Sequence, residues 1–222
     1  MSKNPFPKRL ADILKEWHED SVREEDCKQC SSACCSYAGF AVLENVMLIY
    51  EKYKRGQLVR EDYEFPQGLS FTDFVWKYFD IYIYLTGSRF FKKNIVLFHV
   101  RSLSNDNHPI SIPEGGSYWD VRGSLFHRNP WLNKGCIFLN KKVPNWPEDD
   151  KDSSRMCILH TPDCNNVLSE KPIDCLFFTC TKPLTCKEPT EKISKQWRRA
   201  LAVSYPDSER RFRALIDKQP SK

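Results

Sequence analysis

The chain lacks the sequence features that mark several large classes of protein. No apolar run approaches the ~18 to 20 residues of a membrane-spanning helix, and the start, MSKNPFPKRLADILKEW, has no apolar segment of the length that a secretory signal needs. The motifs GxGxxG, GxxxxGKS, HExxH and GxSxG are also missing, so nucleotide-binding, zinc-protease and serine-hydrolase functions lose their usual support. We therefore expect a cytoplasmic protein without a membrane partner.

The composition is that of a globular chain. Its 222 residues are 41% hydrophobic and 28% charged. A domain of this size buries about 70% of the surface of its unfolded chain, so it does not need a metal merely to compensate for a small core. Neither an internal repeat nor a low-complexity linker divides the sequence, and we predict one domain over residues 1–222.

The net charge of +5 is concentrated at the end of the chain. Residues 191–222 hold nine Lys or Arg against four Asp or Glu, an excess equal to the whole net charge. A solvated helical face accounts for this excess, and a surface for nucleic acid or an acidic partner is the alternative. No aromatic-interleaved RNA-binding motif supports nucleic acid. The sequence does not decide whether the partner is a protein or a small molecule.

Ten cysteines stand out, four of them within nine residues. The stretch CKQCSSACC contains Cys27, Cys30, Cys34 and Cys35 with the spacing C-x2-C-x3-C-C. A C-x2-C turn directs two thiolates at one ion with little backbone cost. Because cytosolic thiols stay reduced, such a cluster more often binds metal than forms disulfides, and we predict a metal site here. Radical S-adenosylmethionine enzymes carry the opposite order, C-x3-C-x2-C, which argues against that class.

The adjacent pair Cys34 and Cys35 complicates a single four-cysteine site. The Cβ directions of neighbouring residues differ by about 180° in a strand and about 100° in a helix, so both sulfurs do not easily reach one ion. One of the two thiolates then serves a second metal, bridges two metals or packs in the core.

Apolar residues at helical spacing predict helices at both ends of the chain and in its first half. The second predicted helix ends at Gly56, a natural C-terminal glycine, and Ser70 or Thr72 is expected to cap the third. Pro206 is expected to separate two helices near the end of the chain. The first predicted helix begins near Pro7. The other predicted helices cover residues 42–53, 70–85, 191–203 and 207–217.

Runs of β-branched and aromatic residues predict a small antiparallel sheet. These runs are IVLFHV (95–100), SYWDVRG (117–123), GCIFLN (135–140) and MCILH (156–160). The segment KPIDCLFFTC is expected to be a turn into an apolar segment, and TKPLTCKEPT a loop. The expected fold class is α+β, with helices around a small antiparallel sheet and a cysteine-ligated metal centre.

The order of the cysteine segments resembles the YkgJ-type CxxCxxxCC family, whose members are described as zinc- or iron-chelating and often as iron–sulfur-cluster proteins. The matching pieces are CKQCSSACC, GCIFLN, CILH and KPIDCLFFTC, and together they touch most of residues 25–181. There are departures, because Leu176 stands where the family often has Arg and Thr179 where Pro is common. The resemblance implies a single metal-binding domain with its core in 25–181 and C-terminal helices over 191–217.

Carried over residue by residue, the resemblance implies eight metal ligands, whereas Cys164 and Cys186 fall outside its pattern. Eight thiolates suit two four-cysteine sites, and both iron–sulfur clusters and zinc accept four thiolates. We expect iron–sulfur, because the resemblance implies it, and keep zinc as the alternative. The implied ligands are Cys27, Cys30, Cys34, Cys35, Cys136, Cys157, Cys175 and Cys180.

Three functions are compatible with these residues. The first is a cytoplasmic protein with one or two iron–sulfur clusters in a redox or substrate-handling role. The second is a non-enzymatic interaction module that zinc stabilises and whose basic C-terminal helix binds a partner. The third is a protein-modifying enzyme, because some proteins with similar cysteine clusters methylate lysines of flagellin. Whether the protein is an enzyme is left open.

Overall fold

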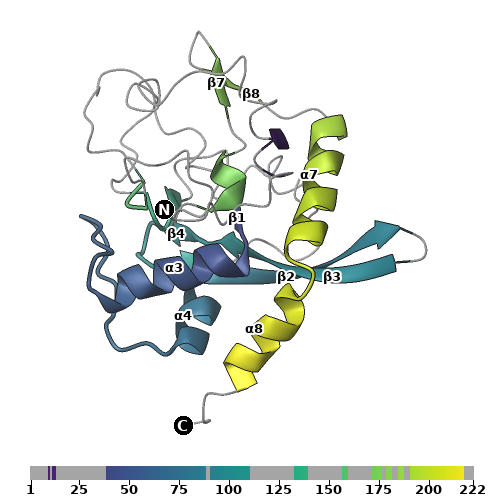
Figure 1. The fold of residues 1–222 in the computed structure, drawn as a ribbon. Helices are drawn as coiled ribbons and strands as arrows, with labels where there is room; N and C mark the ends of the chain where they lie inside the picture. The colour runs from purple at the N-terminus through teal and green to yellow at the C-terminus, as the bar shows by residue number, and fades with distance from the viewer. Residues whose placement is uncertain are drawn as a thin grey trace, which may run out of the picture.

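The computed structural model describes residues 10, 12–13, 39–88, 91–110, 133–139, 157–159, 172–176, 179–181, 185–187 and 191–217. Helices pack around small antiparallel sheets, which confirms the α+β class (Figure 1). The elements are β1 (Phe40–Ala41), α3 (Leu43–Lys54), α4 (Phe71–Tyr78), β2 (Phe79–Ser88), β3 (Phe91–Val100), β4 (Ser102–Ser104), β5 (Pro109–Ile110), β6 (Asn133–Cys136), the 3-10 helix η3 (Ile173–Leu176), β7 (Thr179–Thr181), β8 (Thr185–Lys187), α7 (Glu191–Ser204) and α8 (Ser208–Asp217).

A long antiparallel hairpin, β2–β3, forms the centre of the fold. Its paired residues run from Phe79 and Val100 to Ser88 and Phe91, and β1 pairs with the other edge of β3. The strand predicted over 95–100 is therefore confirmed. In Figure 1 the hairpin extends beyond the rest of the sheet, with α7 and α8 on opposite sides of it.

The first strand of this hairpin corrects one prediction. The helix expected over 70–85 ends at Tyr78, and β2 begins at the next residue. The segment FDIYIYLT is rich in β-branched and aromatic residues, which fit a pleated surface as well as a helix. Pairing with β3 along ten residues decides between the two, because it supplies partners for the backbone groups of β2.

Residues 95–100 of β3 are buried on both faces of the sheet. Val96, Phe98 and Val100 pack in one apolar cluster with residues of α3, α4 and α8. Ile95 and Leu97, which alternate with them, pack in a second cluster with residues of α7 and η3. This double burial explains why the strand reads as a nearly continuous apolar run, since both faces must exclude water.

The end of α3 has the geometry that Gly56 predicted. The Gly56 N–H donates to the Tyr53 carbonyl at 2.9 Å, and the Gln57 N–H donates to the Lys52 carbonyl at 3.0 Å. Gly56 has a φ of 67°, in the left-handed region. These two bonds and this φ form a Schellman motif, which satisfies carbonyls at the helix end.

Two further helix boundaries lie where the sequence predicts them. The Ser70 side chain accepts a hydrogen bond from the Asp73 N–H at 3.1 Å and caps α4. Pro206 lies between α7 and α8, as expected from its missing N–H donor. With 14 residues, α7 is longer than any other helix among the described residues, none of which has the length and apolar character to cross a membrane.

The first predicted helix is seen in part. Leu10 is helical and fully buried, and Ile13 is helical and nearly so. Both pack with Trp197 and Leu201 of α7 in the second apolar cluster. The beginning of the chain therefore contributes to the same face of the sheet as α7.

A second sheet has the order β5–β4–β6. A turn in NDNHP, residues 105–109, joins β4 to β5, with Asn107 at a φ of 61°, a conformation that asparagine tolerates. The strand predicted in GCIFLN is found slightly earlier, as β6, and the run over 117–123 lies outside the described residues. The prediction of a loop over residues 181–190 is partly wrong, because Thr185–Lys187 forms β8 and pairs with β7. Cross-strand pairing and two β-branched threonines in β7 favour the hairpin.

Candidate functional site

The eight predicted metal ligands fall into two groups. Cys27, Cys30, Cys34 and Cys35 lie outside the described residues. The other four are placed: Cys136 ends β6, Cys157 forms an isolated bridge, Cys175 lies in η3 and Cys180 in β7.

Cys136 is buried at the point where β6 turns away from β4. It pairs with Ser102 and is 6% exposed. Gly135, immediately before it, has a φ of 77°, a conformation that residues other than glycine rarely adopt. The Leu139 N–H then donates to the Cys136 carbonyl at 2.9 Å and closes a turn. Glycine and turn together fix the backbone on both sides of Cys136.

Cys157 is held next to this turn. It forms a bridge with Leu139, and the Ile158 N–H donates to the Phe138 carbonyl at 2.8 Å. The ends of a four-residue turn lie within about 7 Å and bridge partners within about 5.5 Å. The Cα atoms of Cys136 and Cys157 are therefore at most about 12 Å apart, although 20 residues separate the two in sequence.

Residues 100–102 connect this pair to the beginning of β1. The Val100 N–H donates to the Gly39 carbonyl at 3.1 Å, and Ser102 pairs with Cys136. Gly39 lies four residues after Cys35, so chain length alone keeps the two Cα atoms within about 14 Å. Gly39, the first described residue after CKQCSSACC, therefore lies beside the segment 100–102 that also pairs with Cys136.

Cys175 lies in η3, which is next to β1. The helix η3 contacts β1, and Ile173 packs in the same apolar cluster as Phe40. The Cys175 N–H donates to the Pro172 carbonyl at 2.9 Å, and the residue is partly exposed. The Pro in KPIDC therefore marks the beginning of the turn that presents Cys175.

Cys180 lies farther along the chain, in the β7–β8 hairpin, which Figure 1 shows apart from the central sheet. Its register partner is Cys186. Among the residues that the structure describes, no group of three or more His, Cys, Asp or Glu side chains is placed to hold one metal ion together. The structure brings Cys136 and Cys157 together and places Cys175 in η3, next to β1, whereas Cys180 lies in the separate β7–β8 hairpin.

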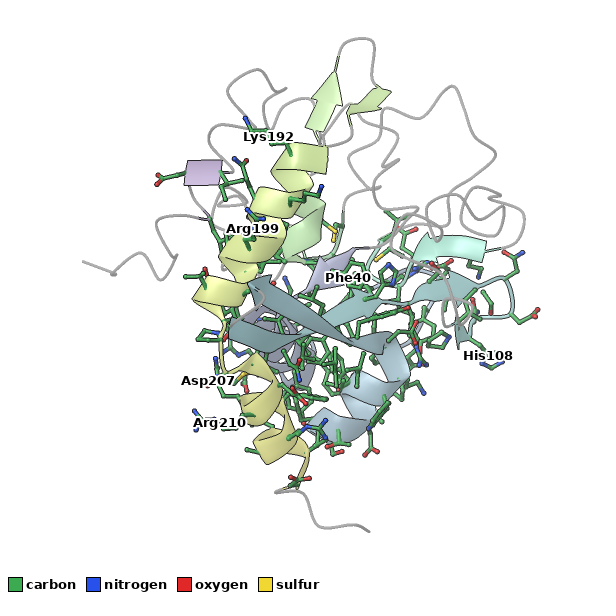
Figure 2. All side chains as sticks on the ribbon, turned by 90° about the vertical axis from the view of Figure 1, so that its right-hand side faces the viewer. Phe40, His108, Lys192, Arg199, Asp207 and Arg210 are labelled. Carbon is green, nitrogen blue, oxygen red and sulfur yellow. The ribbon has the colours of Figure 1, made fainter. Side chains whose placement is uncertain are left out.

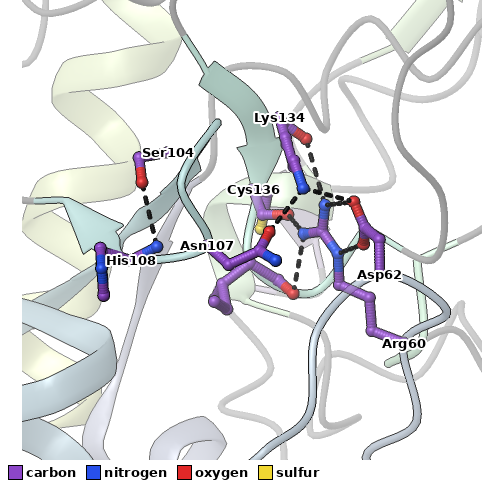
Figure 3. A network of polar contacts seen from close by, with 8 residues as sticks. Arg60, Asp62, Ser104, Asn107, His108, Lys134 and Cys136 are labelled. Atoms are coloured by element: carbon purple, nitrogen blue, oxygen red, sulfur yellow. Dashed lines mark hydrogen bonds and ion pairs between the residues drawn. The ribbon is translucent and has the colours of Figure 1, made fainter.

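A buried arginine holds the loop that bears Cys136 (Figure 3). Arg60, 4% exposed, donates from Nη1 to the carbonyls of Cys136 at 2.9 Å and Ile137 at 3.2 Å, and from Nη2 to that of Lys134 at 3.5 Å. Its Nε and Nη2 donate to the Asp62 carboxylate at 2.6 and 3.4 Å. These five hydrogen bonds match the five donors of a guanidinium group. We call Arg60 and Asp62 the arginine clamp.

Charge as well as hydrogen bonding stabilises the arginine clamp. Partial burial raises the pKa of Asp62, but the hydrogen bond and charge of Arg60, together with Lys134, outweigh it and hold the pKa below its usual value. The Lys134 ammonium lies 3.4 Å from the same carboxylate. Asp62 therefore remains ionised and pairs with two cations beside the Cys136 loop.

The clamp is reached from solvent through a surface hollow of about 670 Å³. Residues of the segment 56–67 line it, Arg60 and Asp62 among them, and Asn107 adds to the wall. Glu61 and Glu64 also face it, so the hollow carries both signs of charge. Because Asp62 lies in the wall, it can exchange its proton with water.

Sequence reasoning did not identify Arg60. It is separated from Cys136 by 76 residues and stands in an ordinary segment, QLVREDYE, where nothing distinguishes it from a surface arginine. The one signal is the acidic residue Asp62 two positions later, and an acid at this spacing is too common to indicate a buried ion pair. Arg60 lies in the part of the chain that the cysteine motifs left unexplained.

Comparison of the chain with protein-family models, curated proteins and solved structures found no match.

Proposed function

We propose that the protein is a cysteine-ligated metal protein of the cytoplasm that holds one or two iron–sulfur clusters in a redox or substrate-handling role. One observation supports this proposal: three predicted ligands from segments far apart in the sequence, Cys136, Cys157 and Cys175, lie near residues 100–102 and β1. Cys136 ends β6, Cys157 forms a bridge with Leu139, and Cys175 lies in η3; Gly39, just before β1, follows Cys35 by four residues.

The chemistry of the donors fits the proposed metal. Thiolates bind iron–sulfur clusters and zinc in preference to hard cations such as magnesium. The ligands would come from the eight cysteines that the resemblance implies, with Cys136 positioned by the arginine clamp. An iron–sulfur cluster, when bound, supplies one-electron transfer or a Lewis-acidic iron. The chain's own contribution is to hold the thiolates and to limit the access of water.

The decisive measurement is the metal content of protein purified without oxygen. We expect stoichiometric iron and acid-labile sulfide, with the broad visible absorption of thiolate-bound iron. Cys136→Ser should lower the iron content, whereas Cys164→Ser, outside the predicted ligand set, should leave it unchanged. Colourless protein with stoichiometric zinc would refute the iron–sulfur proposal and favour the zinc alternative. Equal iron in both variants would remove Cys136 from the site.

The zinc-stabilised interaction module remains the second candidate, because α7 presents exposed Lys192 and Arg199 (Figure 2). The charge on α8 supports it less. Each of the three arginines of α8 has an acidic partner: Arg210 with Asp207, Arg211 with Glu44, and Arg213 with Glu209. These exposed pairs reduce the charge that α8 offers to nucleic acid. For this candidate, chelation should unfold the protein, and stability unchanged by metal removal would argue against it.

A further inference from the structure

The β7–β8 hairpin places two cysteines directly opposite each other. Thr179 pairs with Lys187, Cys180 with Cys186, and Thr181 with Thr185. Cys186 lies outside the pattern that the family resemblance implies, and no role for it was predicted. The register gives it one, because residues directly opposite in an antiparallel pair lie on the same face of the ladder.

The spacing of such a pair suits a disulfide. Directly opposite residues in antiparallel strands have Cα atoms about 4.5 or 5.5 Å apart, depending on which of the two alternating positions they occupy. A disulfide requires a Cα separation of about 4.4 to 6.8 Å. Either position falls within this range, so Cys180 and Cys186 can be joined without a rearrangement of the hairpin backbone.

The local sequence also favours thiol chemistry. The segment TCTKPLTCK, residues 179–187, contains both cysteines within seven residues. Thiol–disulfide exchange proceeds by attack of a thiolate on a sulfur of a disulfide. Both sulfurs belong to one short hairpin, so the second attack is intramolecular and has only a small loop to close.

We propose that Cys180 and Cys186 form a redox-active pair that passes between a dithiol and a disulfide. With a small-molecule disulfide as oxidant, one thiolate attacks a sulfur of that disulfide, forms a mixed disulfide and releases one small thiolate. The second cysteine thiolate then attacks the mixed disulfide, forms the Cys180–Cys186 bond and releases the second small thiolate. The two cysteine sulfurs lose two electrons, the small disulfide gains them, and the two small thiolates take up the protons that the cysteines gave to solvent.

This pair would also regulate the metal site, a consequence that rests on the proposed function. Cys180 belongs to the predicted ligand set, and a disulfide would withdraw its thiolate. Oxidation should then lower metal retention. The redox pair itself requires no metal, so its test is independent of the metal analysis.

The test uses the full chain equilibrated with mixtures of reduced and oxidised glutathione, quenched with an alkylating reagent and cleaved after Phe178 and Lys187. The resulting peptide, 179–187, contains Cys180 and Cys186 and no other cysteine. As the share of oxidised glutathione rises, we expect more of the peptide to carry no alkyl group. Its mass should then be two hydrogen atoms below that of the unmodified dithiol peptide. Peptide alkylated at both positions in every mixture would overturn the proposal, as would Cys180 linked to a different cysteine.

A shifted cysteine separates register from mere proximity. In Cys186→Ser combined with Thr185→Cys, the number of cysteines is unchanged, but the second one moves by one residue and therefore to the other face of the strand. We expect a roughly tenfold lower yield of linked peptide from this variant at a fixed glutathione mixture. Cys164→Ser is the matched control and should form the disulfide as the wild type does. A linked peptide in equal yield from the shifted variant would show that register plays no part.

Metal analysis of Cys186→Ser distinguishes this proposal from the function above. The variant should lose the disulfide and keep its metal, because Cys186 is outside the predicted ligand set. Wild-type protein without metal would refute the proposed function alone. Metal-bearing wild-type protein that never forms the disulfide would refute the redox pair alone.

Discussion

Replacing Arg60 with methionine should destabilise the folded protein through the loop that bears Cys136. Methionine keeps much of the apolar stem of arginine but removes all five donors. The carbonyls of Cys136 and Ile137, both buried residues, lose their Arg60 donor. The Cys136 carbonyl keeps the Leu139 N–H as a donor, so the cost of an unsatisfied buried polar group, about 1 to 3 kcal/mol, applies to the Ile137 carbonyl.

The orphaned Asp62 adds less than a fully buried ion would. Removing one partner of a buried ion pair costs about 3 to 5 kcal/mol. The Asp62 side chain is 21% exposed and keeps Lys134 at 3.4 Å, so water and a second cation share its charge. We therefore expect a total loss of about 3 kcal/mol, to which the Ile137 carbonyl contributes more than Asp62.

Urea unfolding of the wild type and of two variants measures this loss. With about 2 kcal/mol per molar urea, the midpoint for Arg60→Met should fall by about 1.5 M. Arg55→Met is the matched control, because Arg55 is exposed on the same segment, and its effect should remain within about 0.5 kcal/mol. Arg60→Lys should fall between the two, since an ammonium lacks the planar fork. Equal midpoints for Arg60→Met and Arg55→Met would refute the reasoning.

Two further predictions concern acid and a helix cap. Burial raises the pKa of Asp62 but Arg60 lowers it further, so the net shift is downward from 3.8, and the clamp's contribution is complete above that pH and is lost as the pH falls through the folded-state pKa. Wild-type and Asp62→Asn urea midpoints should therefore differ at neutral pH and converge in acid, and a constant difference would contradict this. Ser70→Ala removes the acceptor for the Asp73 N–H and should lower the free energy of unfolding by about 1 kcal/mol in the same assay. Ser70→Asp should restore most of it, and no loss in Ser70→Ala would show that the cap contributes little.

Local signals were sufficient where a boundary depends on the chemistry of one or two residues. Gly56 alone permits the left-handed turn that ends α3, and Ser70 supplies the acceptor that begins α4. Pro206 separates α7 from α8 because it lacks an N–H donor. The apolar run IVLFHV indicated a strand, and the double burial of β3 explains why it contains so few polar residues.

Local signals failed where distant pairing decides the conformation. FDIYIYLT has the composition of a strand and, after the α4 pattern, also continues a helical stripe. Ten residue pairs with β3 settle it as β2. TKPLTCKEPT reads as a loop from its proline and lysines, yet Thr185–Lys187 pairs with β7. The local sequence does not show which strands will pair, and the stability of a strand depends on the neighbouring strand with which it pairs.

The candidate site divides in the same way. The amino-acid sequence by itself determined which residues can bind metal, because thiolate chemistry and the C-x2-C-x3-C-C spacing are local properties. Only the tertiary structure decided which chain segments meet at residues 100–102, that Arg60 holds the Cys136 loop from 76 residues away, and that Cys186 lies opposite Cys180. The physical reason is that a ligand's chemistry belongs to its side chain, whereas its neighbours are chosen by strand register and by the burial of an ion pair.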